Sequence, residues 1–149
     1  MHLLTSALLA LSLLPSTAMA TPAIEENSTI LATLQRLHAV SSPAASDEER
    51  RRAVDEALAK ITESELLART AVAARFMSSG RAEDESIDRV YWIAFWECVK
   101  RLAARTDDAS VMQLERVAVD ANLGGGELML MNEARERQKR AIRERKEKR

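Results

Sequence analysis

The apolar residues of this chain recur mostly at three- and four-residue intervals, which is the period of an amphipathic α-helix. On this basis we predict five or six helices, each with one polar face and one apolar face. The expected ranges are 28–40, 47–61, 63–79, 84–105, 108–122 and a last helix that begins near residue 127. The alternative for the second and third of these helices is one continuous helix over 47–79. The pattern therefore predicts an all-α fold.

Residues 90–99 differ from the rest because they are apolar nearly all the way round, and Glu97 alone is charged among them. Four of the chain's five aromatic side chains lie here: Tyr91, Trp92, Phe95 and Trp96. The apolar arc of helix 84–105 covers roughly 200° at 100° per residue, so this helix needs at least two packing partners. We expect it to be the central helix, with the aromatic rings in the core. The alternative is that the rings line a pocket or a partner groove.

Cys98 is the only cysteine, which excludes an intramolecular disulfide. A thiol inside an apolar stretch is most often a small buried hydrophobe. An intermolecular disulfide is the alternative, and it requires Cys98 to be exposed.

Capping patterns mark several helix ends. Ser46 with Glu49, and Thr62 with Glu65, have the spacing of a capping box, in which the two side chains bond the free amides of a helix start. Residues 124–126 are three glycines, for which we expect a flexible turn, with an anion-binding nest as the alternative.

We expect helix 108–122 to bury Val111, Met112, Leu114, Val117 and Val119. We expect the last helix to dock through Leu128, Met129, Leu130 and Met131.

Residues 1–20 have the layout of a secretory signal peptide. An apolar run over 3–14 is followed by Pro15 and by the small-x-small sequence of residues 18–20. The run is too short to span a bilayer. Since no Lys or Arg precedes it, an uncleaved anchor is the alternative. We expect a mature chain from Thr21, exported to the periplasm or secreted, with one helical domain over 21–132.

Charge divides the chain at residue 133. Residues 133–149 hold nine Lys/Arg and four Asp/Glu, whereas residues 21–132 hold thirteen and nineteen. We expect a charged, basic helical tail with i,i+4 pairs at Glu133–Arg137, Glu136–Arg140 and Glu144–Lys148. An anionic envelope surface could contact its cations, which are Arg135, Arg137, Lys139, Arg140, Arg143, Arg145, Lys146, Lys148 and Arg149. Interleaved acidic residues and the lack of aromatic residues disfavour nucleic acid.

Residues 47–61, DEERRRAVDEALAKI, resemble the first helix of a HEAT-like two-helix repeat: an acidic start, arginines, then small and apolar positions ending in Leu and Ile. When the sequence is aligned with itself at an offset of 41 residues, Ala57 aligns with Cys98 and Ile61 with Leu102. This offset lies in the range of repeat lengths found in HEAT proteins. This resemblance implies a short solenoid that serves as a binding scaffold. An irregular helical bundle is the alternative packing.

The sequence contains no zinc-protease, serine-hydrolase, phosphate-loop, paired-cysteine or dinucleotide-binding motif. His38, the one histidine after the leader, has no partner ligand in sequence, and we predict no catalytic residue, metal or cofactor. We therefore expect an exported, non-enzymatic helical domain that serves protein interaction or assembly. The alternative is a small-ligand-binding protein or enzyme that uses a cleft beside Trp92 and Trp96.

Overall fold

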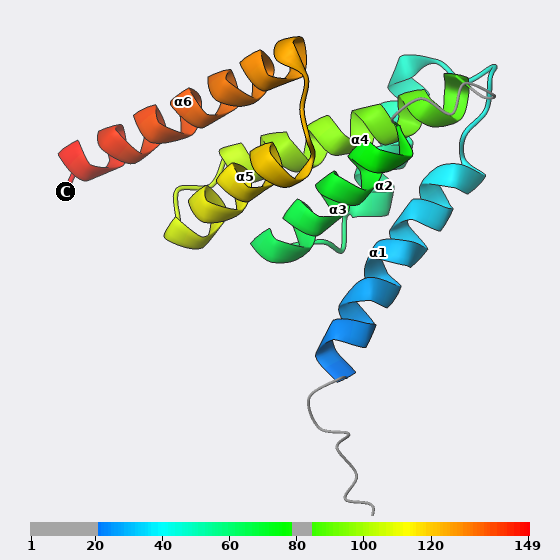
Figure 1. Cartoon of the computed structure of the whole chain (residues 1–149), viewed down its shortest axis with the longest axis horizontal. Helices are drawn as coiled ribbons and strands as arrows, with labels where there is room; N and C mark the ends of the chain where they lie inside the picture. Colours follow the sequence, from blue (N-terminus) through cyan, green and yellow to red (C-terminus); the bar gives the residue numbers. More distant parts are fainter. Residues whose placement is uncertain (1–20, 79–84) are drawn as a thin grey trace, which may run out of the picture.

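The computed structural model describes residues 21–78 and 85–149, and the side chains of 28–78 and 89–149 (Figure 1). Its helices are α1 (Thr21–Ala39), α2 (Asp47–Leu58), α3 (Ser64–Met77), α4 (Glu85–Ala103), α5 (Asp108–Asp120) and α6 (Gly125–Glu147). No strand occurs in these residues, so the predicted all-α class is confirmed. The leader over 1–20 lies outside the described residues. None of the described helices is long and apolar enough to cross a membrane.

Helix α4 is the centre of the fold, as predicted. It contacts each of the other helices and packs most extensively against α3. In Figure 1, α6 and α1 lie on opposite sides of α4. Among the described residues α2 contacts α1 and α4 but not α3, whereas a HEAT-like repeat requires its two helices to pack together. The packing is therefore that of an irregular helical bundle and not of a stacked solenoid.

The core forms where α3 and α4 lie against each other. Ala71 and Ala74 on α3 and Ala94 on α4 are completely buried, and these small side chains let the two backbones approach closely. The largest fully buried side chains around them include Tyr91, Phe95, Leu37, Leu58, Leu67, Leu102, Leu114 and Met131. Burying each side chain of this size contributes roughly 1.5–3 kcal/mol.

The start of α2 is fixed by the predicted capping box. The Glu49 amide donates to Ser46 Oγ at 3.2 Å, and the Ser46 amide donates to the Glu49 carboxylate at 2.6 Å. Helix α2 ends at Leu58 and α3 begins at Ser64, so the alternative of one long helix over 47–79 is wrong.

The predicted capping box at Thr62 and Glu65 is also wrong. Helix α3 has Glu63 at its N-cap position, and no side chain caps it there. Tertiary contacts define this helix start instead. The Thr62 carbonyl accepts a hydrogen bond from Arg105, and the Ser64 hydroxyl pairs with the Ser110 hydroxyl of α5 at 2.6 Å.

Two apolar stripes are narrower than expected. On α5 Leu114 and Val117 are buried but Met112 and Val119 are exposed, because the helix meets its neighbours along one face only. On α6 only Met131 of the four predicted docking residues is buried, whereas Leu128, Met129 and Leu130 are exposed.

The three glycines belong to the start of α6 and do not form a separate flexible turn. Gly124 is the N-cap residue, and Gly125 and Gly126 lie in the first turn. The Gly124 amide donates to the Glu127 carboxylate at 3.0 Å, which satisfies one of the free amides at this helix start.

Candidate functional site

An open groove of about 660 Å³ lies between α4 and α6, which run side by side in the same direction (Figure 1). The described residues that line it are Trp92, Trp96, Val99, Lys100, Ala103 and Ala104 of α4, and Leu130, Ala134, Arg137 and Ala141 of α6. On each helix these positions repeat at three- and four-residue intervals, so each wall is one helix face. At 1.5 Å per residue, the stretch from Trp92 to Ala104 is about 18 Å long.

The aromatic residues of α4 divide between the core and this groove. Tyr91 and Phe95 are buried, as expected. Trp92 and Trp96 are half-buried and line the groove, which is the alternative expectation for these rings, and Trp96 also packs against the core. The Phe95 and Trp96 rings meet edge to face at 4.9 Å, and the Trp92 and Trp96 rings at 5.7 Å. Together the two indoles form an apolar surface at this end of the groove.

Arg75 and Glu127 hold the aromatic end of the groove together. The Arg75 guanidinium of α3 lies 5.8 Å from the centre of the Trp92 ring, within cation–π range. It also forms an ion pair with Glu127 of α6 at 3.0 Å, and both side chains are largely buried. Sequence analysis missed this contact because the two residues are 52 positions apart.

Two cations lie on opposite walls of the groove. Lys100 and Arg137 line it, and their side chains are 78% and 72% exposed. Each pairs with a carboxylate of its own helix, Lys100 with Glu97 at 3.5 Å and Arg137 with Glu133 at 3.6 Å. Exposed pairs of this kind are weak. Both cations line the groove, whereas their carboxylate partners do not, so the charged groups that the groove itself offers to an occupant are cationic.

The far end of the groove is lined by Ala103, Ala104 and Ala141. Below it, the buried Gln138 of α6 donates to the carbonyls of Leu102 and Arg105 at 3.0 and 2.9 Å. Leu102 lies in the last turn of α4 and Arg105 in the segment just after it, so Gln138 caps that helix end from a distant part of the chain.

The segment predicted as a basic tail is therefore not free. Helix α6 runs through the predicted boundary at residue 133 and contacts the bundle beyond it. Gln138 is buried, and Arg145 donates to the Thr106 hydroxyl between α4 and α5 at 2.8 Å. Of the predicted intrahelical pairs, Glu133–Arg137 forms, whereas Glu136 pairs with Lys139 at 2.8 Å instead of with Arg140.

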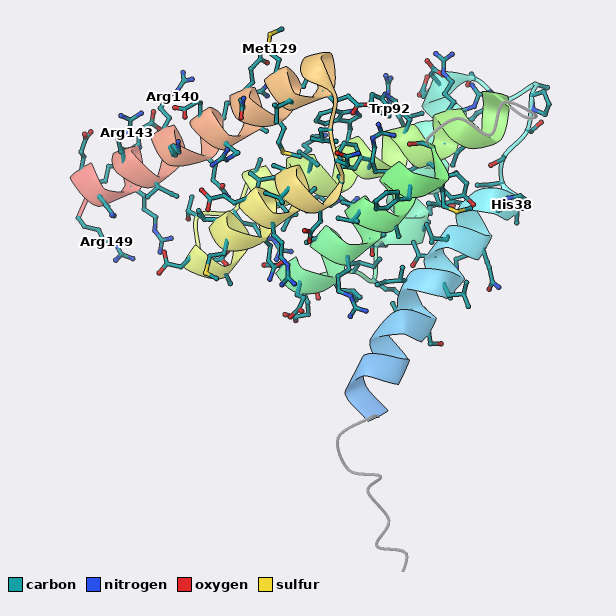
Figure 2. All side chains as sticks on the ribbon, in the orientation of Figure 1. His38, Trp92, Met129, Arg140, Arg143 and Arg149 are labelled. Atoms are coloured by element: carbon teal, nitrogen blue, oxygen red, sulfur yellow. The ribbon has the colours of Figure 1, made fainter. Side chains whose placement is uncertain are left out.

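The nine predicted anion-contacting residues do not share one face. Arg135 pairs with Glu115 of α5 at 3.0 Å, and Arg137 lines the groove. Figure 2 shows Arg140 and Arg143 on the outer side of α6 and Arg149 pointing away from them. Lys146 and Lys148 are also exposed. Successive residues of a helix lie 100° apart, so the run 143–149 surrounds the helix instead of forming a flat basic surface.

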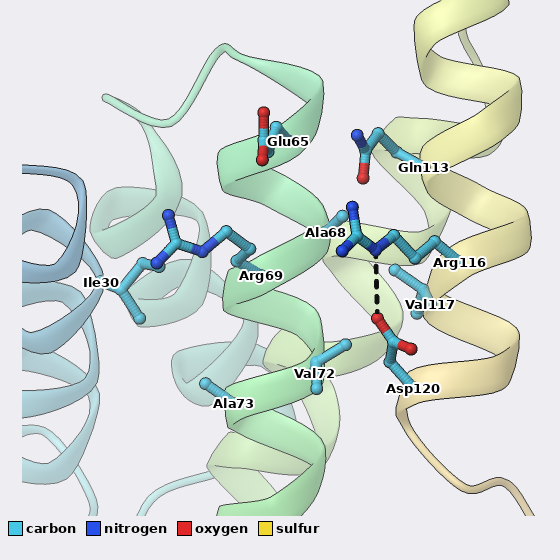
Figure 3. A pocket seen from close by; sticks show the side chains of 10 residues that line it. All are labelled: Ile30, Glu65, Ala68, Arg69, Val72, Ala73, Gln113, Arg116, Val117 and Asp120. Atoms are coloured by element: carbon cyan, nitrogen blue, oxygen red, sulfur yellow. Dashed lines mark ion pairs between the residues drawn. The ribbon is translucent and has the colours of Figure 1, made fainter. Parts of the chain in front are cut away.

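A second pocket, of about 440 Å³, lies between α1, α3 and α5 (Figure 3). Its apolar floor includes Ile30, Val72 and Val117. Its polar lining contains both signs of charge, with Glu65 and Asp120 against Arg69 and Arg116, and also the neutral Gln113. Arg116 and Asp120 pair at 3.4 Å, as the dashed line in Figure 3 marks. Because both acidic and basic groups line this pocket, its charges do not favour an anionic ligand over a cationic one.

The cysteine and the histidine lie apart from both pockets. Cys98 is completely buried, and burial raises the pKa of its thiol to about 12. The expectation of a buried Cys98 is confirmed. His38 is exposed on α1 (Figure 2). No group of three or more His, Cys, Asp or Glu side chains in the described residues is arranged to hold a metal ion.

Comparisons of this chain with protein-family models, with curated proteins and with solved structures find no match. Its function must therefore be inferred from the geometry of its own surfaces.

Proposed function

We propose that this protein is an exported, non-enzymatic interaction domain, and that the α4–α6 groove receives a helix of a partner protein. The observation that carries the proposal is the pair of half-buried indoles, Trp92 and Trp96, on an open apolar groove. Two parallel helix faces with apolar stripes are the geometry of helix-in-groove recognition. Trp and Arg are also the residue types that contribute most often to binding hot spots.

Export is supported by the sequence pattern of residues 1–20 alone. Expression of the full chain in a bacterial host and N-terminal sequencing of the product test it. We expect the exported product to begin at Thr21, whereas retention of the whole chain in the membrane fraction would favour an uncleaved anchor.

A small apolar ligand is the second candidate occupant. The groove volume of about 660 Å³ favours it, because small-molecule sites commonly measure about 300–1,000 Å³ and are mostly apolar with few polar groups. Against it, the groove is open along its length, whereas such sites bury most of the surface of their ligand.

The test is affinity capture from exported fractions with wild type and two matched variants. Ala141→Phe places a ring in the alanine-lined end of the groove, and Asn132→Phe places the same ring on an exposed position of α6 that does not line it. We expect proteins bound by wild type to be lost with Ala141→Phe and kept with Asn132→Phe. Equal recovery with both variants would contradict the proposal.

Direct titration completes the test. Helical peptides from each captured protein are added to the purified chain while tryptophan emission is recorded. We expect one of them to shift the emission of wild type and to leave that of Ala141→Phe unchanged. A shift caused by metabolite mixtures, with no response to any peptide, would support the small-ligand candidate instead.

A further inference from the structure

The α4–α6 groove is asymmetric along its length, and this asymmetry restricts what can occupy it. One end is formed by Trp92, Trp96 and Leu130, the other by alanines, and the two cations lie between. The aromatic end offers large apolar side chains, whereas the alanine end offers small ones. A bulky apolar side chain therefore buries more apolar surface at the aromatic end than at the alanine end.

The position of the cations distinguishes a helix from an acyl chain. Lys100 belongs to the α4 wall and Arg137 to the α6 wall, so the positive charges flank the apolar floor on both sides. A fatty acid carries a single carboxylate, which can pair with a cation on only one of the two walls. A docked amphipathic helix has flanking positions on both sides of its apolar stripe, as the e and g positions of a coiled coil flank its a and d positions.

We propose that the groove selects an acidic amphipathic helix of a partner protein, an inference that rests on the function proposed above. Such a helix has a bulky apolar residue at the aromatic end of the groove. Its apolar stripe is flanked by Asp or Glu on both sides, which face Lys100 and Arg137. The charge complementarity between these carboxylates and the two cations carries the proposal.

The test uses the full chain and two synthetic, side-chain-stapled helical peptides with the same tryptophan-free apolar stripe, flanked by Glu in one and by Lys in the other. Binding is measured by calorimetry and by the emission of the protein's tryptophans. We expect the Glu peptide to bind about tenfold more tightly, and the difference to shrink as salt rises, because exposed charge pairs are screened.

Charge reversal is the decisive variant. Lys100→Glu/Arg137→Glu should reverse the preference so that the Lys peptide binds more tightly. Arg140→Glu/Arg143→Glu, at exposed positions on α6 that do not line the groove, is the matched control and should keep the wild-type preference. Lys100→Ala/Arg137→Ala should remove the preference while both peptides still bind, which keeps the test valid if the double reversal fails to fold.

The outcomes separate this inference from the proposed function. Equal binding of both peptides to wild type would overturn the acidic preference and leave helix docking in place. Binding of sodium oleate by wild type with no binding of either peptide would overturn both. A dimer whose dissociation is required before the Glu peptide binds would identify a second copy as the occupant and overturn the inference.

Discussion

Trp92 and Phe95 are three residues apart on α4 and have different surroundings. Phe95 is completely buried, whereas Trp92 is half-buried at the groove. The sequence predicts that a wide arc of this helix avoids water, because periodicity reports which residues are apolar. It does not report where the neighbouring helices end. The apolar arc of α4 is wider than the surface that the neighbouring helices cover. The uncovered edge of this arc, which includes Trp92 and Trp96, therefore remains open and forms one wall of the groove.

The two rings should differ in their effect on stability. Phe95→Ala should lower the free energy of unfolding by about 3–5 kcal/mol, because it leaves a cavity in the core. Trp92→Ala should cost clearly less, because a half-exposed ring loses less burial when it is removed. Urea denaturation of both variants measures this. Equal losses would mean that Trp92 is as buried as Phe95 in solution.

Cys98 should be inert in the folded protein. Burial raises the pKa of its thiol to about 12, and the thiolate is the reactive form. A colorimetric thiol reagent at pH 8 should therefore react with no thiol in native protein and with one per chain in denaturant. Rapid labelling of the native protein, or a disulfide-linked dimer on a non-reducing gel, would contradict the buried position.

At the scale of elements, helix ends were predictable only where the cap is local. The Ser46–Glu49 box lies within four consecutive residues, and the structure contains it. The cap on the end of α4 comes from Gln138, 36 positions away from Leu102. A glutamine in a charged helix carries no sequence signal for this role, because the role depends on how α6 packs.

Gln138→Leu should destabilise the protein by about 1–3 kcal/mol, because the carbonyls of Leu102 and Arg105 both lose a side-chain hydrogen bond while the site stays covered, and Leu102 keeps only its bond from the Arg105 amide. Gln35→Leu, at an exposed position of α1, is the matched control and should change little. Thermal unfolding followed by circular dichroism measures both. Similar unfolding temperatures for the two variants would show that the contact contributes nothing to stability.

Two capping carboxylates should make stability depend on pH. Hydrogen bonds from the Ser46 amide and hydroxyl lower the pKa of Glu49, and those from the Ser110 amide and hydroxyl lower the pKa of Asp107. Because the folded pKa lies below the ordinary value, this stabilisation is present above the ordinary carboxyl pKa and is lost as pH falls through the folded one.

Urea midpoints of wild type should therefore decrease from pH 6 to pH 3. In Asp107→Asn the decrease should be smaller. Asp108→Asn, one residue beyond the N-cap, is the control and should retain the wild-type slope. An unchanged slope in Asp107→Asn would show that its carboxylate is not bonded in the folded state.

At the scale of the whole molecule, the sequence predicted the all-α class and the central helix but placed a boundary inside α6. The boundary came from the excess of Lys and Arg after residue 132. Charge composition reports which residues prefer water, and a helix can be mostly charged while a narrow stripe of it packs. Here the stripe includes Ala134, Gln138 and Ile142, which are buried or half-buried. Wall positions of the groove lie in the same stretch, so the site could not be assembled from the sequence.

Residues 133–149 should accordingly be part of the folding unit. Deleting them removes Gln138 from the end of α4 and uncovers the apolar surface beneath Ala134 and Ile142, at an expected cost of about 2–4 kcal/mol. Deleting only 146–149, which are exposed, should change little. Urea denaturation of the two truncated chains distinguishes these outcomes. If the chain ending at residue 132 unfolds at the wild-type midpoint, the basic segment is an independent tail, and the α4–α6 groove is not a fixed feature of the protein in solution.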